Sequence, residues 1–411
     1  MPSTGLRILL SEGSSTSARE ALTVLGSNGH KVEICDPDRH CLTRFSRLIT
    51  RFHLCPSLRD DPAGYLEFVE DLLERHSFDV LLPIHEQGLL FARARERIAP
   101  RVAVALPSFE SYWTALNKSE FSRLLQELAL TQPPTRRVTW ADLPHLATYP
   151  CVLKSMIGTA SRGTAVLRAP ADILPAQAAM AENEVVTDEI LLQEFVPGPV
   201  EHAQAVFCRG ELIGFHAFRQ LRAGGGGGDS LKESANRPRV RMEIARIGRR
   251  LAWHGALSVD YILHAPDEAP FYIDCNPRLV EPMSAFLSGV DLVDLLLAIS
   301  LSTSPAPVQD GRAGIRSHLG IQALMGQALA SGARRDVIRE TWNLFTRRGP
   351  YADSVEELTP FRRDWPSVVP LIATAALLVV RPRAAGWMQR KGWGRHLLGA
   401  KAIALITQGL I

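Results

Sequence analysis

Several common signatures are missing from this 411-residue sequence. Its six cysteines form no CxxC pair, which argues against a zinc site or a disulfide framework and favours a reducing, cytoplasmic location. The sequence has no GxGxxG after its first strand-like run and no Walker A motif, so the dinucleotide and P-loop fingerprints are both absent. The net charge of +3 is too small to indicate nucleic acid as a partner.

No apolar run is long enough to predict a membrane-spanning helix. The most apolar window, residues 366–380, is shorter than the roughly 20 residues that a spanning helix needs. The N-terminus has no charged segment followed by a long apolar stretch, so we expect no signal peptide. Hydrophobic residues at 46% and charged residues at 22% are typical of a soluble protein, here with two or three domains.

The first part of the chain alternates strand-like and helix-like segments. "LRILL" and "KVEICD" are typical of buried strands, and the capped segment between them, residues 15–30, of a helix. A second helix-like segment at 63–76 precedes the strand-like "DVLLPI". This alternation predicts a parallel sheet covered by helices, in an α/β domain over residues 1–108.

From residue 109 the pattern changes to hairpins between helices, which is typical of an α+β arrangement. We assign 109–301 to a second domain, with a subdomain at about 133–197 that contains a hairpin with a glycine- and hydroxyl-rich tip. The glycine run within 222–238 predicts a mobile loop, because runs of glycine have no preferred backbone state. Residues 302–411 are expected to form a C-terminal, mostly helical extension.

The strand-like segment "PFYIDCNPR", residues 270–278, ends in polar side chains. Strand alternation places Asp274, Asn276 and Arg278 on one face, whereas Cys275 turns to the core. Buried carboxylate, amide and guanidinium groups need partners, which a divalent cation and a phosphate would supply. A salt-bridged strand end followed by an Asn-Pro turn explains the same residues equally well.

Asp260 lies on the other arm of the same predicted hairpin. A bend near residues 266–270 would bring it level with Asp274, about 5 Å away as a cross-strand neighbour. Two carboxylates at that distance repel unless a cation lies between them. Mg²⁺ takes a few protein oxygens and completes its shell with phosphate oxygens, so Asp260, Asp274 and Asn276 form a candidate metal site.

Two lysines and a small-residue loop are candidates for phosphate binding. Lys154 ends a strand before the loop "GTASRGT", where Gly158 and Gly163 permit close approach of backbone N–H groups to a phosphate. Lys118 follows Asn117 near a helix start. Taken alone, an exposed hairpin tip and a solvated helix lysine explain these residues as well.

A further candidate site follows the apolar segment "LLQEFVPG". The bend at Pro197 and Gly198 would free backbone groups after Gln193 to hydrogen-bond a planar heterocycle. Glu201 could then accept hydrogen bonds from ribose hydroxyls. The alternative is an ordinary strand-to-turn transition with a surface glutamate.

The order of these pieces along residues 1 to about 300 resembles the ATP-grasp superfamily. The likeness is greatest to carbamoyl phosphate synthetase, whose glycine-rich loop ending in GDS is similar to "GGGGGDS" here, and it is weaker to biotin carboxylase and D-alanine–D-alanine ligase. It rests on Lys118, Lys154 with its loop, Gln193 to Gly198, Glu201, Asp260 and the Asp274-x-Asn276-Pro-Arg278 segment. The family usually has Glu at the position of Asp274, and its phosphate loop is richer in glycine.

The resemblance implies an α/β domain, then a two-subdomain ATP-grasp fold in which 133–197 covers the nucleotide. It implies that Lys118 and Lys154 contact ATP phosphates and that Arg278 and Lys154 act in catalysis. It implies nucleotide contacts from Gly158, Gly163, Gln193, Glu194, the Val196 backbone and Glu201, and Mg²⁺ or Mn²⁺ bound by Asp260, Asp274 and Asn276.

The implied reaction is an ATP-dependent ligation of a small carboxylic acid to an amine or thiol through an acyl phosphate. Residues 224–228 could close over the intermediate and exclude water. Candidate contacts to the second substrate are Glu281, His216, Arg219 and Arg222, which surface salt bridges explain equally well.

Two other function classes stay open at this stage. A non-catalytic ATP-binding regulatory or scaffold protein could use the same pocket, and a nicotinamide oxidoreductase could use the first domain, although GxGxxG is absent. A homodimer is the default expectation for the assembly.

The end of the chain has no acidic residue after Asp364. Its basic residues are interleaved with Trp387, Trp393 and apolar runs: Arg381, Arg383, Arg390, Lys391, Arg395 and Lys401. Weak contact with an anionic membrane surface is one hypothesis. The alternative, which we favour from the sequence, is a helical cap packed on the core with its basic side chains in water.

Overall fold

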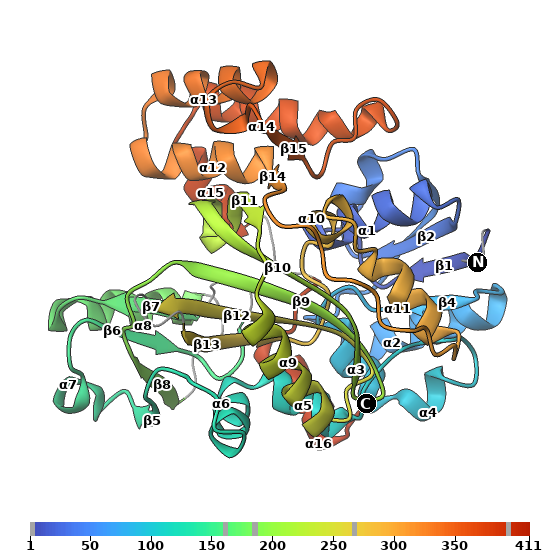
Figure 1. The fold of residues 1–411 in the computed structure, drawn as a ribbon, viewed down its shortest axis with the longest axis horizontal. Coiled ribbons are helices and arrows are strands. Elements are labelled where there is room, and N and C mark those ends of the chain that lie inside the picture. Colours follow the sequence, from blue (N-terminus) through green and yellow to red (C-terminus); the bar gives the residue numbers. More distant parts are fainter. Residues whose placement is uncertain (1–4, 159–162, 183–187, 265–268, 392–395) are drawn as a thin grey trace.

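A computed structural model describes residues 5–158, 163–182, 188–264, 269–391 and 396–411. Three sheets organise these residues, and Figure 1 shows the N-terminal sheet, a small sheet and the C-terminal helices on three sides of the largest sheet. The expected α/β and α+β fold class is confirmed.

The N-terminal sheet is parallel, as the alternating pattern predicts. Its strand order is β3-β2-β1-β4, from β1 (Arg7–Leu10), β2 (Lys31–Asp36), β3 (Ile49–Leu54) and β4 (Val80–Leu82). Its helices are α1 (Thr16–Ser27), α2 (Pro62–Arg75), α3 (Gln87–Arg93) and α4 (Arg95–Ile98). Ser15 caps α1 by accepting a hydrogen bond from the Ala18 N–H, which fixes where the helix begins beside the end of β1.

Two helices lead from this domain to the small sheet: α5 (Phe109–Leu116) and α6 (Lys118–Glu127), the second capped by Asn117. The small sheet is antiparallel with the order β5-β8-β6-β7, from β5 (Thr135–Thr139), β6 (Cys151–Lys154), β7 (Thr164–Leu167) and β8 (Glu189–Glu194). Helices α7 (Leu143–Leu146) and α8 (Ile173–Glu182) accompany it. These strands fall within or at the edge of the expected 133–197 subdomain.

The largest sheet has seven strands in the order β13-β12-β9-β10-β11-β14-β15. They are β9 (Val200–Cys208), β10 (Glu211–Ala223), β11 (Asp229–Ser234), β12 (Gly255–His264), β13 (Ala269–Asn276), β14 (Arg316–His318) and β15 (Ser354–Glu356). Helices α9 (Pro238–Arg250), α10 (Met283–Leu287) and α11 (Leu292–Ser300) belong to the same part of the chain.

The C-terminal region contains α12 (Gly320–Ser331), α13 (Arg334–Thr346), α14 (Val368–Val380), α15 (Ala384–Lys391) and α16 (Ala400–Gln408). It is mostly helical as expected, but its strands β14 and β15 continue the largest sheet beyond the domain limit at residue 301. α16 returns to pack beside α3, where Ala402 and Ile406 are fully buried.

One prediction about the largest sheet is wrong. Residues 222–238, expected to be a mobile loop, contain the strand β11, which pairs with both β10 and β14. The glycine run forms a short 3-10 turn, Gly225–Gly227, packed against Gln322 and Met325 of α12. Because neighbouring backbone and α12 supply partners to the glycines, their intrinsic freedom does not decide the local structure.

The N-terminal domain and the largest sheet share apolar cores, whereas the small sheet and the helices α12, α13, α14 and α15 have clusters of their own. Ile8, Leu10 and Ile34 of the N-terminal sheet share one apolar cluster with Leu292 and Leu296 of α11. A second cluster joins α2, α3 and α5 to the largest sheet. This shared packing holds the end of β1 and the start of α1 beside the largest sheet, which positions the site described next.

Candidate functional site

The hairpin β12–β13 brings the two predicted metal-ligand carboxylates together. Asp260 and Asp274 are direct partners in the strand register, and Ser258 is the partner of Asn276. The turn of the hairpin, residues 265–268, lies outside the described residues. Both carboxylates are about a quarter exposed, at 25% and 24% of the side chain, and both line one pocket. Cys275, which points to the other side, is buried as expected.

Lys118 and Lys154 converge on this hairpin from two different elements. The Lys118 Nζ donates to Asp274 Oδ1 at 2.7 Å and to the Gly158 carbonyl at 3.1 Å. The Lys154 Nζ donates to the Ile273 carbonyl at 2.6 Å. Burial, together with the charge of Lys118, lowers the pKa of Lys154 to about 8 against the opposing effect of Asp274. Two cations thus lie beside the paired carboxylates.

Arg278 follows β13 and lines the same pocket. It is 9% exposed, and its Nη2 donates a long hydrogen bond of 3.4 Å to Asn276 Oδ1. Burial lowers the pKa of this guanidinium, although Glu86 acts in the opposite direction. A buried guanidinium that faces a pocket is suited to bind an anion.

The end of β8 and the residues after it form the opposite wall. Gln193, Glu194 and Val196, the predicted adenine contacts, line the pocket, and the Gln193 amide donates to Thr135 Oγ1 at 2.8 Å. Apolar side chains beside them complete a slot: Val152, Val166, Phe195, Ile262 and Ile273. An apolar lining with a few fixed polar groups suits a heterocycle.

The phosphate loop can be described only at its ends. Gly158 lines the pocket, whereas Gly163 has a φ of +78° and its carbonyl accepts from the Ser155 N–H at 2.7 Å. Residues 159–162, on which the predicted closure of the loop depends, lie outside the described residues.

Glu201 is not placed where the resemblance implies. It is 1% exposed and lies on the face of β9 opposite to the pocket, because the pocket-lining residues of that strand are Val200, His202 and Gln204. The guanidinium of Arg237 donates to both Glu201 oxygens, at 2.6 and 2.7 Å, and the Tyr261 hydroxyl donates at 2.8 Å. The ribose contact is therefore wrong for this structure, and Glu201 is a structural residue.

Of the four candidates for the second substrate, only Glu281 lines the pocket. His216 is buried with Nε2 at 3.2 Å from Ser284 Oγ, and burial lowers its pKa to about 3. Arg219 pairs with Glu233, and Arg222 pairs with Glu340 and Tyr351. These three side chains already have protein partners away from the pocket, so their predicted role is wrong for this structure.

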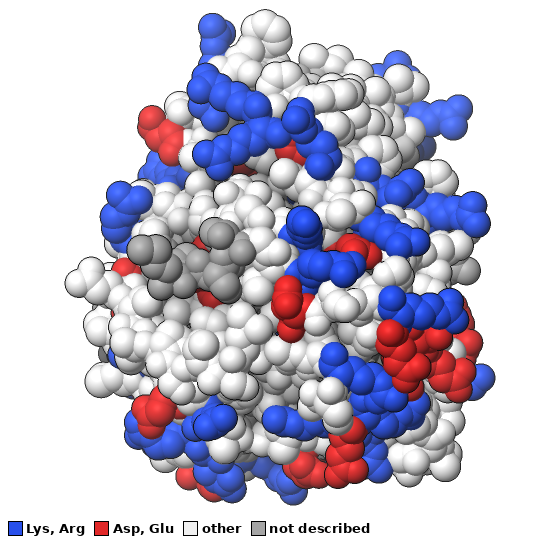
Figure 2. Space-filling model, turned by 90° about the vertical axis from the view of Figure 1, so that its right-hand side faces the viewer, with Lys and Arg blue, Asp and Glu red and all other residues white. Residues whose placement is uncertain are grey.

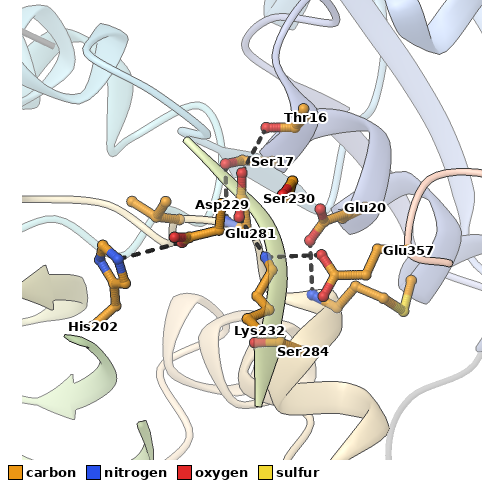
Figure 3. Close-up of polar contacts among 12 residues, drawn as sticks. Thr16, Ser17, Glu20, His202, Asp229, Ser230, Lys232, Glu281, Ser284 and Glu357 are labelled. Atoms are coloured by element: carbon orange, nitrogen blue, oxygen red, sulfur yellow. Dashed lines mark hydrogen bonds and ion pairs between the residues drawn. The ribbon is translucent and has the colours of Figure 1, made fainter. Parts of the chain in front are cut away.

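Sequence reasoning missed a buried charge cluster around Glu281, which Figure 3 shows. Lys232 of β11 is fully buried between Glu281 and Glu357, with its Nζ 2.9 Å from a Glu357 oxygen. Burial would lower the pKa of this lysine, but Glu281 and Glu357 raise it well above its usual value. The Glu281 N–H also donates to Ser17 Oγ at 3.0 Å, so α1 and the largest sheet meet here.

A second missed group is His202, whose ring lies between two carboxylates, one of which, Asp229, is seen in Figure 3. Its Nδ1 is 2.8 Å from Asp260 Oδ1, and its Nε2 is 3.3 Å from Asp229 Oδ2. Although burial acts to lower the pKa of His202, the two carboxylates raise it well above the usual value. Asp229 lies in the glycine-rich segment, but the strand β11 that positions it was not predicted.

The pocket that these residues line has a volume of about 740 Å³. One part is formed by the small sheet and the hairpin, and another by Ser15, Thr16 and Ser17 of the N-terminal domain together with His85. The size and the mixed apolar and polar lining suit a small-molecule ligand. A separate hollow of about 860 Å³, lined in part by Arg95 and Arg209, contains none of the predicted site residues.

The donor chemistry of the hairpin fits Mg²⁺. Asp260, Asp274 and Asn276 supply hard oxygen donors on one pair of strands, and Mg²⁺ prefers such donors together with phosphate oxygens and water. Among the residues that the structure describes, no group of three or more His, Cys, Asp or Glu side chains could hold a metal ion. The fit therefore requires oxygens from a ligand in addition to the protein.

No protein-family model matches the sequence. The solved structures that resemble the chain include L-amino acid ligase from Bacillus licheniformis, with a TM-score of 0.56 and 16% identity over 73% of this chain and 75% of that one. The N5-carboxyaminoimidazole synthetase of Staphylococcus aureus complexed with ADP has a TM-score of 0.60 and 12% identity, over 84% of this chain and 87% of that one. A third structure is the biotin carboxylase domain dimer of Hydrogenobacter thermophilus 2-oxoglutarate carboxylase, complexed with MgADP, ADP and bicarbonate. It has a TM-score of 0.60 and 13% identity, over 76% of this chain and 74% of that one.

The chain has the ATP-grasp fold. At identities of 12–16% these structures show the fold alone and leave the particular likeness to carbamoyl phosphate synthetase untested. The fold nevertheless explains why two sheets, a hairpin with acidic side chains and two converging lysines surround one pocket.

Proposed function

We propose that this protein is an ATP-dependent ligase that joins a carboxylate to an amine or a thiol through an acyl phosphate, with Mg²⁺ or Mn²⁺. The observation that supports this proposal most directly is the convergence of Lys118, Lys154, Arg278 and the Asp260–Asp274 pair on one pocket. Similarity to an L-amino acid ligase and to ADP-bound synthetase and carboxylase structures supports the proposal.

In this proposal the adenine lies in the slot formed by Val152, Phe195 and Ile273, with hydrogen bonds from the backbone near Glu194 and Val196. The phosphates lie toward Lys118, Lys154 and the Gly158 end of the loop. We keep the domains expected above, 1–108, 109–301 with a nucleotide subdomain at about 133–197, and 302–411, with β14 and β15 of the last region extending the sheet of the second.

The chemistry follows from charge. When bound, the nucleotide and metal supply a phosphoryl group and a Lewis acid to the reaction. Lys154 and Arg278 lower the repulsion between the attacking carboxylate and the phosphoryl group, and they stabilise negative charge that develops during transfer. The metal would be held by Asp260, Asp274 and Asn276. In this structure the negative charge of the two carboxylates is balanced by Lys118, beside Asp274, and by His202, beside Asp260.

The test is Mg²⁺-dependent release of ADP and phosphate from ATP, with pools of amino acids, small carboxylic acids and bicarbonate. We expect release that requires one pool and that is lost in Asp274→Ala. The matched control is Asp310→Ala, which removes a surface carboxylate paired with Arg241 outside the pocket and should leave the rate unchanged.

A second readout separates catalysis from binding. If Mg-ADP raises the unfolding temperature of the wild type but no pool supports release, the protein is a non-catalytic nucleotide-binding protein instead. If Mg-ADP has no effect on unfolding at up to millimolar concentration, the nucleotide site itself is wrong.

A further inference from the structure

The last part of the chain has a larger net positive charge than the whole protein. Residues 334–411 contain 13 Lys and Arg against six Asp and Glu, whereas the whole chain has a net charge of only +3. Of those six acids only Asp353 is exposed, and Glu340 and Asp364, for example, are buried in ion pairs. The same residues include nine exposed arginines: Arg334, Arg335, Arg339, Arg347, Arg348, Arg362, Arg363, Arg381 and Arg383.

The same region exposes large apolar side chains at helical spacing. On α13, Ile338, Trp342 and Phe345 are 51%, 58% and 51% exposed, and their i, i+4, i+7 spacing places them on one face. The other face of α13 buries Val337 and Leu344 in a cluster with α12 and α14. The exposed face therefore has no partner among the described residues.

A second apolar row runs from the segment before η5 (Trp365–Ser367) into α14. Phe361 and Trp365 are 63% and 58% exposed, and Ile372 is 51% exposed. α14 buries Leu371 and Leu378 toward α12 instead. Single exposed apolar residues are ordinary on a protein surface, but two adjoining rows of large ones indicate an interaction site.

The two rows belong to neighbouring elements at one end of the molecule. α13 and α14 contact each other, and both pack on α12 (Figure 1), so their outer faces adjoin. Figure 2 shows Lys and Arg side chains gathered at this upper end, with few acidic ones. The Arg–aromatic surface consists of Ile338, Trp342, Phe345, Phe361, Trp365 and Ile372 with Arg347, Arg348, Arg362 and Arg363.

We propose that the Arg–aromatic surface docks on an anionic lipid bilayer and lies in its interface. Trp and Phe side chains are favoured at the boundary between headgroups and acyl chains, and arginines beside them attract anionic headgroups. No helix in the described part of the chain is long and apolar enough to cross a membrane. The contact is therefore peripheral, and it is independent of the reaction proposed above.

Charge favours a bilayer over a second copy of this chain. A symmetric dimer formed through this surface would bring the same patch of two molecules together. Its arginines would then face arginines, with Asp353 as the only exposed acid in residues 334–411 to oppose them. An anionic membrane supplies both the negative charge and the apolar layer.

The test is co-sedimentation of the full chain with phosphatidylcholine vesicles, with or without phosphatidylglycerol. We expect pelleting only with phosphatidylglycerol, and loss of pelleting as salt rises from about 0.1 M to about 1 M, where screening is nearly complete. Trp342→Ser/Phe345→Ser should lower the partition coefficient roughly tenfold. Arg347→Gln/Arg348→Gln should lower it roughly fivefold for each arginine.

The matched controls change equally exposed residues elsewhere. Leu174→Ser/Met242→Ser removes apolar side chains that are 74% and 62% exposed on α8 and α9, and Arg39→Gln/Arg51→Gln removes exposed charge from the N-terminal domain. Both controls should pellet like the wild type. Absence of pelleting with phosphatidylglycerol, or equal losses in controls and test variants, would overturn the proposal. So would a dimer in solution that Trp342→Ser/Phe345→Ser converts to a monomer, because the surface would then bind a second copy.

Discussion

The substitution Glu201→Gln separates a structural role from a nucleotide-binding role. Wild-type Glu201 is almost fully buried and accepts three hydrogen bonds, two from the Arg237 guanidinium and one from the Tyr261 hydroxyl. Hydrogen bonding to Glu201 raises the pKa of Arg237, because the carboxylate stabilises the charged guanidinium. Glutamine keeps the size of the side chain but removes the charge and one acceptor position.

The expected loss of stability follows from burial. Breaking a fully buried ion pair by removing one partner costs about 3–5 kcal/mol. The Arg237 side chain is 26% exposed, so water can reach part of the guanidinium after the change. We therefore expect the free energy of unfolding to fall by about 2–3 kcal/mol, while the affinity for Mg-ADP stays unchanged.

Urea unfolding measures the change in stability, and calorimetric titration of the same variant with Mg-ADP measures the affinity. Glu127→Gln is the matched control, because Glu127 also pairs with an arginine through both oxygens but is 52% exposed. Such a surface pair contributes about 0–1 kcal/mol. If Glu201→Gln weakened Mg-ADP binding tenfold while the urea midpoint stayed at the wild-type value, Glu201 would contact the nucleotide and our assignment would be wrong.

Three further predictions address other parts of the molecule. Burial raises the pKa of Glu357 from 4.5 to about 7, so this group binds more protons in the folded state and its contribution to stability falls as pH rises from about 4.5 to 7. Glu357→Gln should flatten that part of the stability–pH curve, and an unchanged slope would contradict the assignment. Asp364→Ala, which removes the fully buried partner of Arg19 in α1, should lower the free energy of unfolding by about 3–5 kcal/mol, measured by chemical denaturation. Lys154→Met should weaken Mg-ADP binding roughly tenfold or more in calorimetric titration, since a charged hydrogen bond is lost; equal affinity would show that Lys154 faces no phosphate.

Much of the N-terminal domain could be predicted from the sequence, because its strands are short apolar runs between capped helices. The parallel pairing of β1, β2 and β4 confirms the alternating pattern. β3 was missed because its residues Ile49–Leu54 read "ITRFHL", with charged and aromatic side chains mixed. β3 is an edge strand, so it has one strand partner and a half-exposed surface, and its composition carries little periodicity.

The placement of Glu201 shows how a small uncertainty in register changes a functional assignment. Side chains of a strand alternate between its faces, so a shift of one residue moves a side chain to the other side of the sheet. Val200, His202 and Gln204 line the pocket, and Glu201 between them turns away to Arg237. The start of β9 follows the Pro197–Pro199 bend, where the sequence does not define the phase of alternation.

By itself the sequence indicated most elements of the N-terminal domain and the pairing of Asp260 with Asp274. These follow from local periodicity and from a hairpin whose arms are close in the chain, whereas the candidate roles of Lys118, Lys154 and Arg278 come from the resemblance to the ATP-grasp superfamily. Only the tertiary structure revealed that Lys232, Glu281 and Glu357 form one buried cluster, that His202 bridges two carboxylates and that α13 and α14 expose adjoining apolar faces. Such contacts join residues far apart in the sequence, and no local pattern encodes them.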